Sequence, residues 1–114
     1  MSINLGGYQE NSEEGGTVFA RVNLNQVSVE KVDEVIRIWE EIVIPAAKSQ
    51  KGFCGAYLLT DRKLGKGMGI TFWESEEDAI ANEQSGYYRD QLNKFKSVFI
   101  VPPVRVGYEV SVKV

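Results

Sequence analysis

Apolar and polar residues alternate along the start of the folded region in the manner of a half-buried strand, over residues 18–24. One side of this strand is wholly apolar, whereas the other carries Phe19, Arg21 and Asn23. A polar pair such as Arg21 and Asn23 fits either the wall of a cavity or a surface that faces solvent, and the pattern leaves both interpretations open.

A helix is predicted after Ser28, because serine is a favoured N-cap residue. Apolar residues then recur at the three- and four-residue spacing of a core-facing stripe. The members of this stripe are Val32, Val35, Ile36, Trp39, Val43, Ala46 and Ala47. Pro45 lies inside the stripe and has no backbone N–H, so the helix is expected to kink or to end its regular part there.

Two apolar runs, residues 53–60 and 68–73, flank a polar segment with glycine at residues 61–67. This pattern predicts an antiparallel hairpin. Gly55, Gly67 and Gly69 fall in or beside the two strands. Glycine at such positions indicates either a bulge or a place where another group comes close to the backbone.

A second helix is predicted from the N-cap Ser75, with an interruption at Ser85 and Gly86. Beyond the interruption, apolar residues again follow helical spacing. They are Tyr88, Leu92, Phe95 and Phe99. Pro102 and Pro103 end the helix, and residues 104–113 alternate as a last strand.

The predicted order is therefore strand, helix, strand, strand, helix, strand. Right-handed crossovers arrange this βαββαβ order as a ferredoxin-like α+β domain: a four-stranded antiparallel sheet with both helices on one face. The hairpin strands carry large apolar side chains on both sides. The sheet face without helices is then an association surface, and a homodimer that packs sheet on sheet would cover it.

The length of 114 residues fits one domain at residues 17–114, preceded by a polar, glycine-containing segment that reads as a flexible N-terminal arm at residues 1–16. No apolar run is long enough to span a membrane and no secretory signal is recognisable, so a cytoplasmic protein without a membrane partner is expected. The net charge of −3 argues against a nucleic-acid partner.

The absence of histidine from the whole sequence removes the commonest metal ligand and the commonest general base. Zinc sites and triad hydrolases are disfavoured for that reason. No glycine-rich phosphate loop or dinucleotide motif is present, so neither a metal nor a bound cofactor is expected. The single cysteine, Cys54, excludes an internal disulfide and is expected to be a small buried apolar residue.

Three segments together resemble the antibiotic biosynthesis monooxygenase (ABM) family of dimeric α+β barrels. They are TVFARVNLNQVSVEKVDEVIRIWEE at residues 17–41, GFCGAYLLTDRKLGKGMGITFWESEEDA at 52–79 and SGYYRDQL at 85–92. Trp73 matches the family's tryptophan at the strand end, but Gly69 stands where the anthrone-oxidising members have asparagine. The His and Trp positions of the haem-degrading members fall at Leu92 and Asn82, so haem degradation is not expected.

The resemblance implies a cofactor-independent monooxygenase acting on an electron-rich aromatic molecule, such as a phenol, quinol or anthrone. The fold hosts several reactions, so the resemblance is a weaker guide to chemistry than to fold. The catalytic candidates are Asn23, Trp73 and Arg21. The substrate-binding candidates are Tyr57, Tyr87, Tyr88 and Arg89.

Several of these candidates also have a purely structural interpretation. Trp73 and Tyr88 can be core residues, and Arg89 can belong to a solvated helix face. The carboxylate nearest to an apolar stretch is Glu109, in the last strand. A small-molecule-binding protein without turnover, or an interaction protein that uses the dimer surface, is the alternative to an enzyme.

Overall fold

A computed structural model describes residues 18–114 of the chain, so the N-terminal arm predicted for residues 1–16 lies outside the described residues. The first half of the fold consists of β1 (Phe19–Gln26), a short 3-10 turn η1 (Val29–Lys31), α2 (Val32–Ile38), η2 (Trp39–Val43), α3 (Ile44–Lys48) and β2 (Phe53–Asp61). The second half consists of β3 (Lys66–Trp73), α4 (Glu76–Gln84), α5 (Tyr87–Asn93) and β4 (Val104–Glu109).

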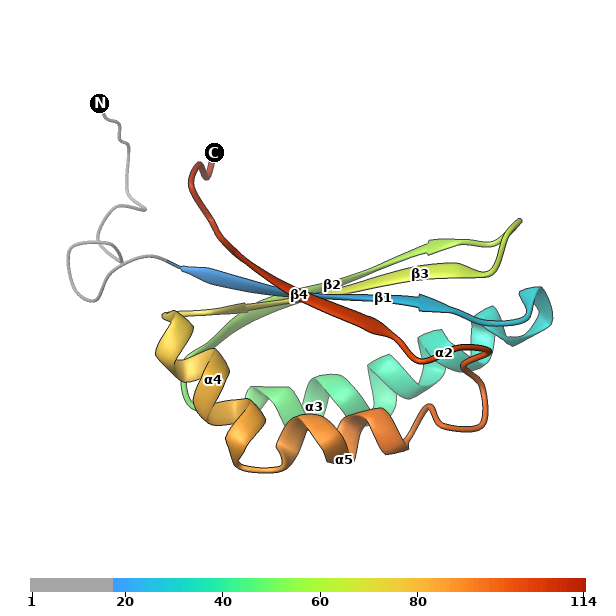
Figure 1. The fold of residues 1–114 in the computed structure, drawn as a ribbon, viewed down its shortest axis with the longest axis horizontal. Coiled ribbons are helices and arrows are strands. Elements are labelled where there is room, and N and C mark those ends of the chain that lie inside the picture. The colour runs from blue at the N-terminus through green and yellow to red at the C-terminus, as the bar shows by residue number, and fades with distance from the viewer. Residues whose placement is uncertain (1–17) are drawn as a thin grey trace.

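The four strands form one antiparallel sheet in the order β2-β3-β1-β4. All the helices lie against the same face of this sheet (Figure 1). The predicted ferredoxin-like α+β fold is therefore confirmed. β4 is shorter than the sequence pattern predicted, because its partner β1 begins at Phe19 and the ladder between them ends at the Phe19–Glu109 pair.

The first helix continues through Pro45, and its regular α-helical part ends before the proline, at Ile38. One turn before the proline, the segment η2 widens into a π-helical turn, and the Ile44 N–H donates to the carbonyl of Trp39. Pro45 follows directly after this wider turn, as the second residue of α3. The irregularity that the proline predicted is thus a π turn within a continuous helical segment.

Two apolar clusters hold the helices on the sheet. The larger one joins α2 and η2 to the segment after α5 and contains Val27, Val32, Val35, Ile38, Val43, Phe95 and Val98. The smaller one, at the other end of the sheet, contains Phe19, Trp73 and Ala79. Residues of both clusters line a cavity between them.

The face of the sheet without helices carries large apolar side chains that are exposed. Strand alternation and register place them together on this face: Leu24, Tyr57, Leu59, Val104 and Tyr108. The prediction that apolar residues occupy both sides of the sheet is therefore confirmed.

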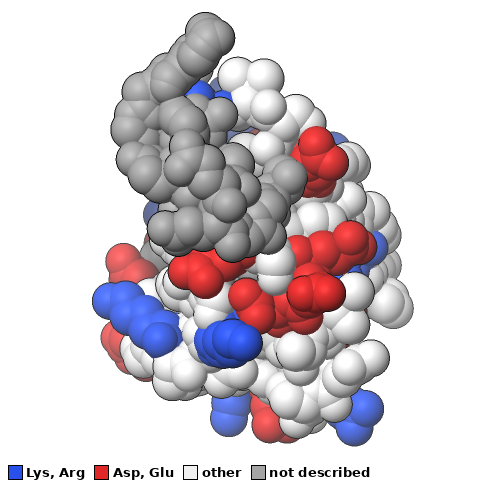
Figure 2. Space-filling model, turned by 90° about the vertical axis from the view of Figure 1, so that its left-hand side faces the viewer, with Lys and Arg blue, Asp and Glu red and all other residues white. Residues whose placement is uncertain are grey.

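The end of the molecule that carries α4 is acidic. Figure 2 shows Asp and Glu side chains gathered there, and the first turn of α4 holds Glu76, Glu77 and Asp78. Acidic side chains near a helix N-terminus stabilise the helix through favourable interaction with its dipole. Their negative charge also repels nucleic-acid phosphates from this face. Within residues 18–114, none of the helices combines the length and the apolar character needed to cross a bilayer.

Candidate active site

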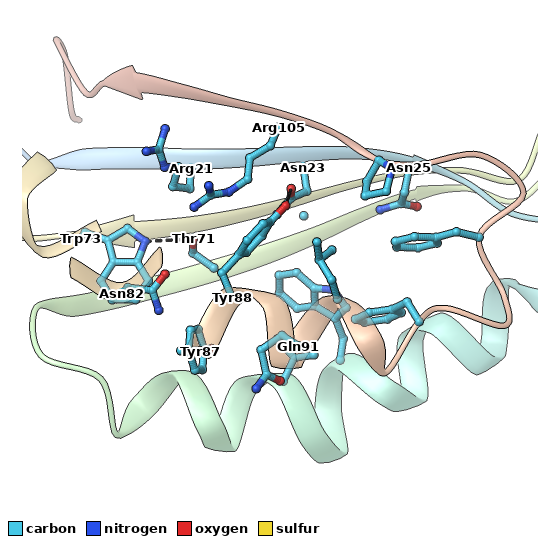
Figure 3. A pocket seen from close by; sticks show the side chains of 17 residues that line it. Arg21, Asn23, Asn25, Thr71, Trp73, Asn82, Tyr87, Tyr88, Gln91 and Arg105 are labelled. Atoms are coloured by element: carbon cyan, nitrogen blue, oxygen red, sulfur yellow. Dashed lines mark hydrogen bonds between the residues drawn. The ribbon is translucent and has the colours of Figure 1, made fainter. Parts of the chain in front are cut away.

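A cavity of about 60 Å³ lies between the helix-covered face of the sheet and the helices (Figure 3). Its polar wall draws on three strands and both helices that follow β3. Its main polar residues are Arg21, Asn23, Thr71, Asn82, Tyr88 and Arg105. The sheet thus brings together side chains that are far apart in the sequence.

The polar face of β1 lines the cavity. Arg21 and Asn23 both line the cavity between the sheet and the helices, which decides between the two interpretations that the sequence left open in favour of a cavity wall. Glycine on the neighbouring strand β4 makes room for Arg21, since Gly107 pairs with it. A Cβ atom on Gly107 would collide with the Arg21 guanidinium, so close approach explains this glycine.

Glu83 of α4 bridges two arginines at the edge of the cavity. One carboxylate oxygen of Glu83 accepts hydrogen bonds from both Arg21 of β1 and Arg105 of β4. Partial burial alone would raise the pKa of Glu83, but the hydrogen bonds and charges of Arg105 and Arg21 hold it below its ordinary value. Arg21, Arg105 and Glu83, called the charged group below, contain two cations and one anion and therefore carry a net positive charge.

Sequence reasoning missed Glu83 and Arg105 and named Glu109 as the nearest carboxylate to an apolar stretch. Glu109 is exposed. Arg105 could have been found from the strand pairing: in the antiparallel register it lies directly opposite Asn23, on the same side of the sheet. Nothing in the sequence pattern indicates that Glu83 lies at the cavity, because α4 is mostly polar and only its packing decides which of its sides faces the sheet.

Tyr88 of α5 reaches across the cavity to the sheet. Its hydroxyl donates to Oδ1 of Asn23 at 2.8 Å, and the Arg105 guanidinium lies 3.7 Å from the centre of its ring. Burial raises the pKa of Tyr88, with only partial opposition from Arg105. The phenol is therefore protonated near neutral pH and can act as a hydrogen-bond or proton donor.

Trp73 is both a core residue and a cavity wall. It is 1% exposed, packs edge-on against Phe53 with the ring centres 5.7 Å apart, and donates from its indole N–H to Thr71 Oγ1 at 3.0 Å. The two interpretations made from the sequence are thus compatible in the structure.

Two buried hydrogen-bond donors without a partner belong to residues that line the cavity. Asn82 is 7% exposed, yet its amide nitrogen finds no hydrogen-bond partner among residues 18–114, and the same holds for Nε of Arg105. A buried donor without a partner destabilises the fold, so a ligand with an acceptor oxygen would relieve that penalty. The described residues contain no cluster of three or more His, Cys, Asp or Glu side chains that could hold a metal ion.

The cavity brings together five of the residues named from the sequence: Asn23, Trp73, Arg21, Tyr87 and Tyr88. Burial raises the pKa of Tyr87 to about 12.

The two other candidates lie elsewhere. Tyr57 is exposed on the opposite face of the sheet, where it contacts Phe72 edge-on, and Arg89 is exposed on α5 outside the cavity wall. Cys54 is exposed as well, so the expectation that it is buried was wrong. A register shift between Phe53 and Gly55 interrupts the alternation of β2 at this residue.

The fold and its cavity define a ferredoxin-like domain with a partly open site between sheet and helices. The model of the antibiotic biosynthesis monooxygenase family matches residues 18–93, and the chain belongs to this family. The uncharacterized protein Rv2557 of Mycobacterium tuberculosis is 32% identical over 72 residues, which are 63% of this chain and 32% of that protein. This chain thus spans about a third of the length of the curated relatives that it matches.

Two solved oxygenase structures share the fold. The monooxygenase ActVA-Orf6 of Streptomyces coelicolor, in complex with nanaomycin D, superposes with a TM-score of 0.71 at 17% identity, covering 86% of this chain and 91% of that one. SnoaB, a cofactor-independent oxygenase of Streptomyces nogalater, superposes with a TM-score of 0.67 at 12% identity, covering 86% of this chain and 97% of that one. At these identities the likeness establishes the fold alone.

Proposed function

We propose that this protein is a cofactor-independent monooxygenase that oxidises an electron-rich aromatic molecule, such as a phenol, quinol or anthrone. The observation that carries the proposal is the cavity between sheet and helices, which combines aromatic walls from Trp73 and Tyr88 with the charged group of Arg21, Glu83 and Arg105. Membership of the ABM family and the shared fold with two oxygenases support it.

The charged group can prepare such a substrate for dioxygen. Its net positive charge favours the anionic form of a bound phenol, and the anion is the form that transfers an electron to dioxygen. One oxygen atom enters the ring as a carbonyl and the other leaves as water, so the substrate supplies all the electrons.

The other polar side chains have roles that follow from their contacts. The unpartnered N–H groups of Asn82 and Arg105 are donors for a substrate oxygen, and the Tyr88 hydroxyl can donate a proton to a peroxide intermediate. Trp73 and the ring of Tyr88 would orient the aromatic ring.

Dioxygen consumption with a panel of hydroquinones and anthrones tests the proposal. We expect uptake by the wild type, a loss of about tenfold or more in kcat/KM for Arg105→Gln, and a smaller loss for Trp73→Phe. Arg62→Gln is the matched control, because Arg62 pairs with Asp33 at 2.9 Å on the surface, away from the cavity. No uptake with any substrate would overturn the proposal and leave the binding of a small molecule without turnover.

We also propose that the protein is a homodimer that pairs the two helix-free sheet faces. The exposed apolar side chains of Leu24, Tyr57, Leu59, Val104 and Tyr108 support this, because a single copy leaves them in contact with water. The cytoplasmic location expected from the sequence stays a prediction.

Light scattering at micromolar concentration tests the dimer. The wild type is expected to show twice the mass of one chain, and Leu59→Lys to weaken the association about tenfold or more. Leu64→Lys is the control, since Leu64 is similarly exposed but lies in the hairpin turn. A monomeric wild type, or equal effects of the two lysine variants, would contradict the proposed interface.

A further inference from the structure

Trp39 separates two hollows of the molecule. On one side its indole lines the cavity of about 60 Å³ described above. On the other side it lines a more open groove of about 300 Å³ between the first helical segment and β2. The other walls of this groove are Ile36, Glu40, Ile44, Ala56, Leu58 and Thr60. Trp39 is the residue that lines both hollows.

The indole occupies its place because Gly69 has no side chain. A Cβ atom at position 69 would lie 2.5 Å from Cζ2 of Trp39, far inside van der Waals contact. The absence of a side chain at Gly69 thus leaves a flat piece of β3 backbone on the cavity floor, and the Trp39 ring covers it. The same position is the one at which the resemblance to anthrone-oxidising proteins fails.

The local helix geometry supports a special role for Trp39. Trp39 is the first residue of the π turn η2 and Val43 is the last, and both line the cavity. Such turns are rare and occur frequently at functional sites, since they redirect side chains that a regular helix would place elsewhere.

The cavity is too small for an aromatic ligand while Trp39 lies on Gly69. A cavity of about 150 Å³ admits benzene, and ligand sites usually measure about 300–1,000 Å³. Displacement of the indole would join the cavity to the groove and bring the total into that range. Changes of side-chain rotamer on binding are common even where the backbone stays fixed.

We propose that the aromatic ligand binds against the backbone of Gly69 in the place of the Trp39 indole, and that Trp39 is the residue that determines how large an aromatic ring system the site accepts. This inference rests on the proposed function in so far as it takes the cavity as the substrate site. It assigns the groove beside β2 to the same site, as the space for the part of the ring system that the cavity cannot hold.

Binding of 2-naphthol, measured by titration calorimetry in the absence of turnover, tests the inference. In Trp39→Ala the ligand no longer has to displace the indole, so 2-naphthol should bind about fivefold or more tightly than to the wild type, with Trp39→Phe in between. In the Trp39→Ala background, where no indole has to move, adding Gly69→Ala places a methyl group in the ligand's place, so binding should weaken about fivefold or more relative to Trp39→Ala alone. Gly55→Ala is the matched control, because it adds a methyl group to a strand glycine where a Cβ meets nothing within 4 Å.

Circular dichroism establishes which variants are folded. If Trp39→Ala is unfolded, the affinity of Trp39→Phe relative to the wild type tests the inference. Equal affinity of the wild type and the Trp39 variants, or equal effects of the Gly69 and Gly55 substitutions, would overturn the inference and leave the proposed function standing. If the Trp39 and Gly69 substitutions change the affinity as expected but the protein consumes no dioxygen, the inference about the binding site stands and the proposed oxygenase activity is overturned. No binding of 2-naphthol to any variant would overturn the inference.

Discussion

Replacement of Glu83 by glutamine perturbs the charge balance of the cavity with little change of shape. Glutamine keeps an acceptor oxygen of the same reach but removes the negative charge that lies between Arg21 and Arg105. Two guanidinium groups would then face each other with nothing to compensate them. Glu83→Gln is therefore expected to destabilise the fold.

The magnitude follows from the burial of the three side chains. Removal of one partner from a fully buried ion pair typically costs about 3–5 kcal/mol. The side chains of Arg21, Arg105 and Glu83 are 17%, 19% and 23% exposed, so water screens part of the repulsion. We expect a loss of about 2 kcal/mol in the free energy of unfolding, which corresponds to a Tm about 10 °C lower.

The pH dependence of stability gives a second signature. The pKa of Glu83 is lower in the folded protein than its ordinary value of 4.5, so the unfolded chain binds more protons in the range between the two values. The contribution of Glu83 is fully present above about pH 4.5 and is lost as the pH falls through the folded-state pKa. Glu83→Gln should therefore differ most from the wild type near neutral pH and approach it in acid.

Urea unfolding at pH 7 and at lower pH measures both effects. Glu41→Gln is the control, because Glu41 pairs with Arg37 at 3.4 Å on the exposed face of the helix and should contribute at most about 0.5 kcal/mol. Adding Arg105→Gln to Glu83→Gln should recover part of the loss, since it removes one of the repelling cations. If Glu83→Gln is no less stable than Glu41→Gln, the reasoning about the charged group is wrong.

Three further substitutions test local features. Ser75→Ala removes the hydroxyl that accepts from the backbone N–H of Asp78 at the start of α4, and should lower the free energy of unfolding by about 1 kcal/mol in urea titrations. Gly86→Ala places a side chain at a φ of 90° and should also lower it by about 1 kcal/mol, whereas Gly55→Ala, with open space around it, should cost less. Burial raises the pKa of Tyr87 to about 12, so its contribution to stability is present below about pH 10 and is lost as the pH rises towards 12. Tyr87→Phe should abolish this alkaline loss, about 1 kcal/mol once the partial exposure of the ring is allowed for; an unchanged alkaline limb would contradict that assignment.

The order of elements and the two faces of the sheet could be read from the sequence, because they depend on local periodicity. The alternation in residues 18–24 separated Arg21 and Asn23 from the apolar side, and the helical stripe beginning at Val32 identified the core face of the first helix. Pro45 signalled an irregularity, although its form as a π turn depends on packing against the sheet.

Tyr57 shows where local pattern is insufficient. Its strand is apolar on both sides, so alternation alone could not tell which side lies under the helices. The register with β3 decides it: Leu58 pairs with Gly69 and faces the helices, and Tyr57 pairs with Ile70 and faces away. The same strand pairing explains why Trp73, at the far end of β3, reaches the cavity and Tyr57 does not.

The order of the predicted elements was sufficient to derive the fold, and the spacing of residues within one element was sufficient to place the polar side of β1 and the tryptophan at the end of β3. The bridge from Glu83 to Arg21 and Arg105, and the contact of Trp39 with Gly69, arise only from the packing of the folded domain. These contacts join residues from different elements, so they depend on strand order and on the rotation of each helix about its axis. Those quantities are set by the packing of the whole domain rather than by any local pattern.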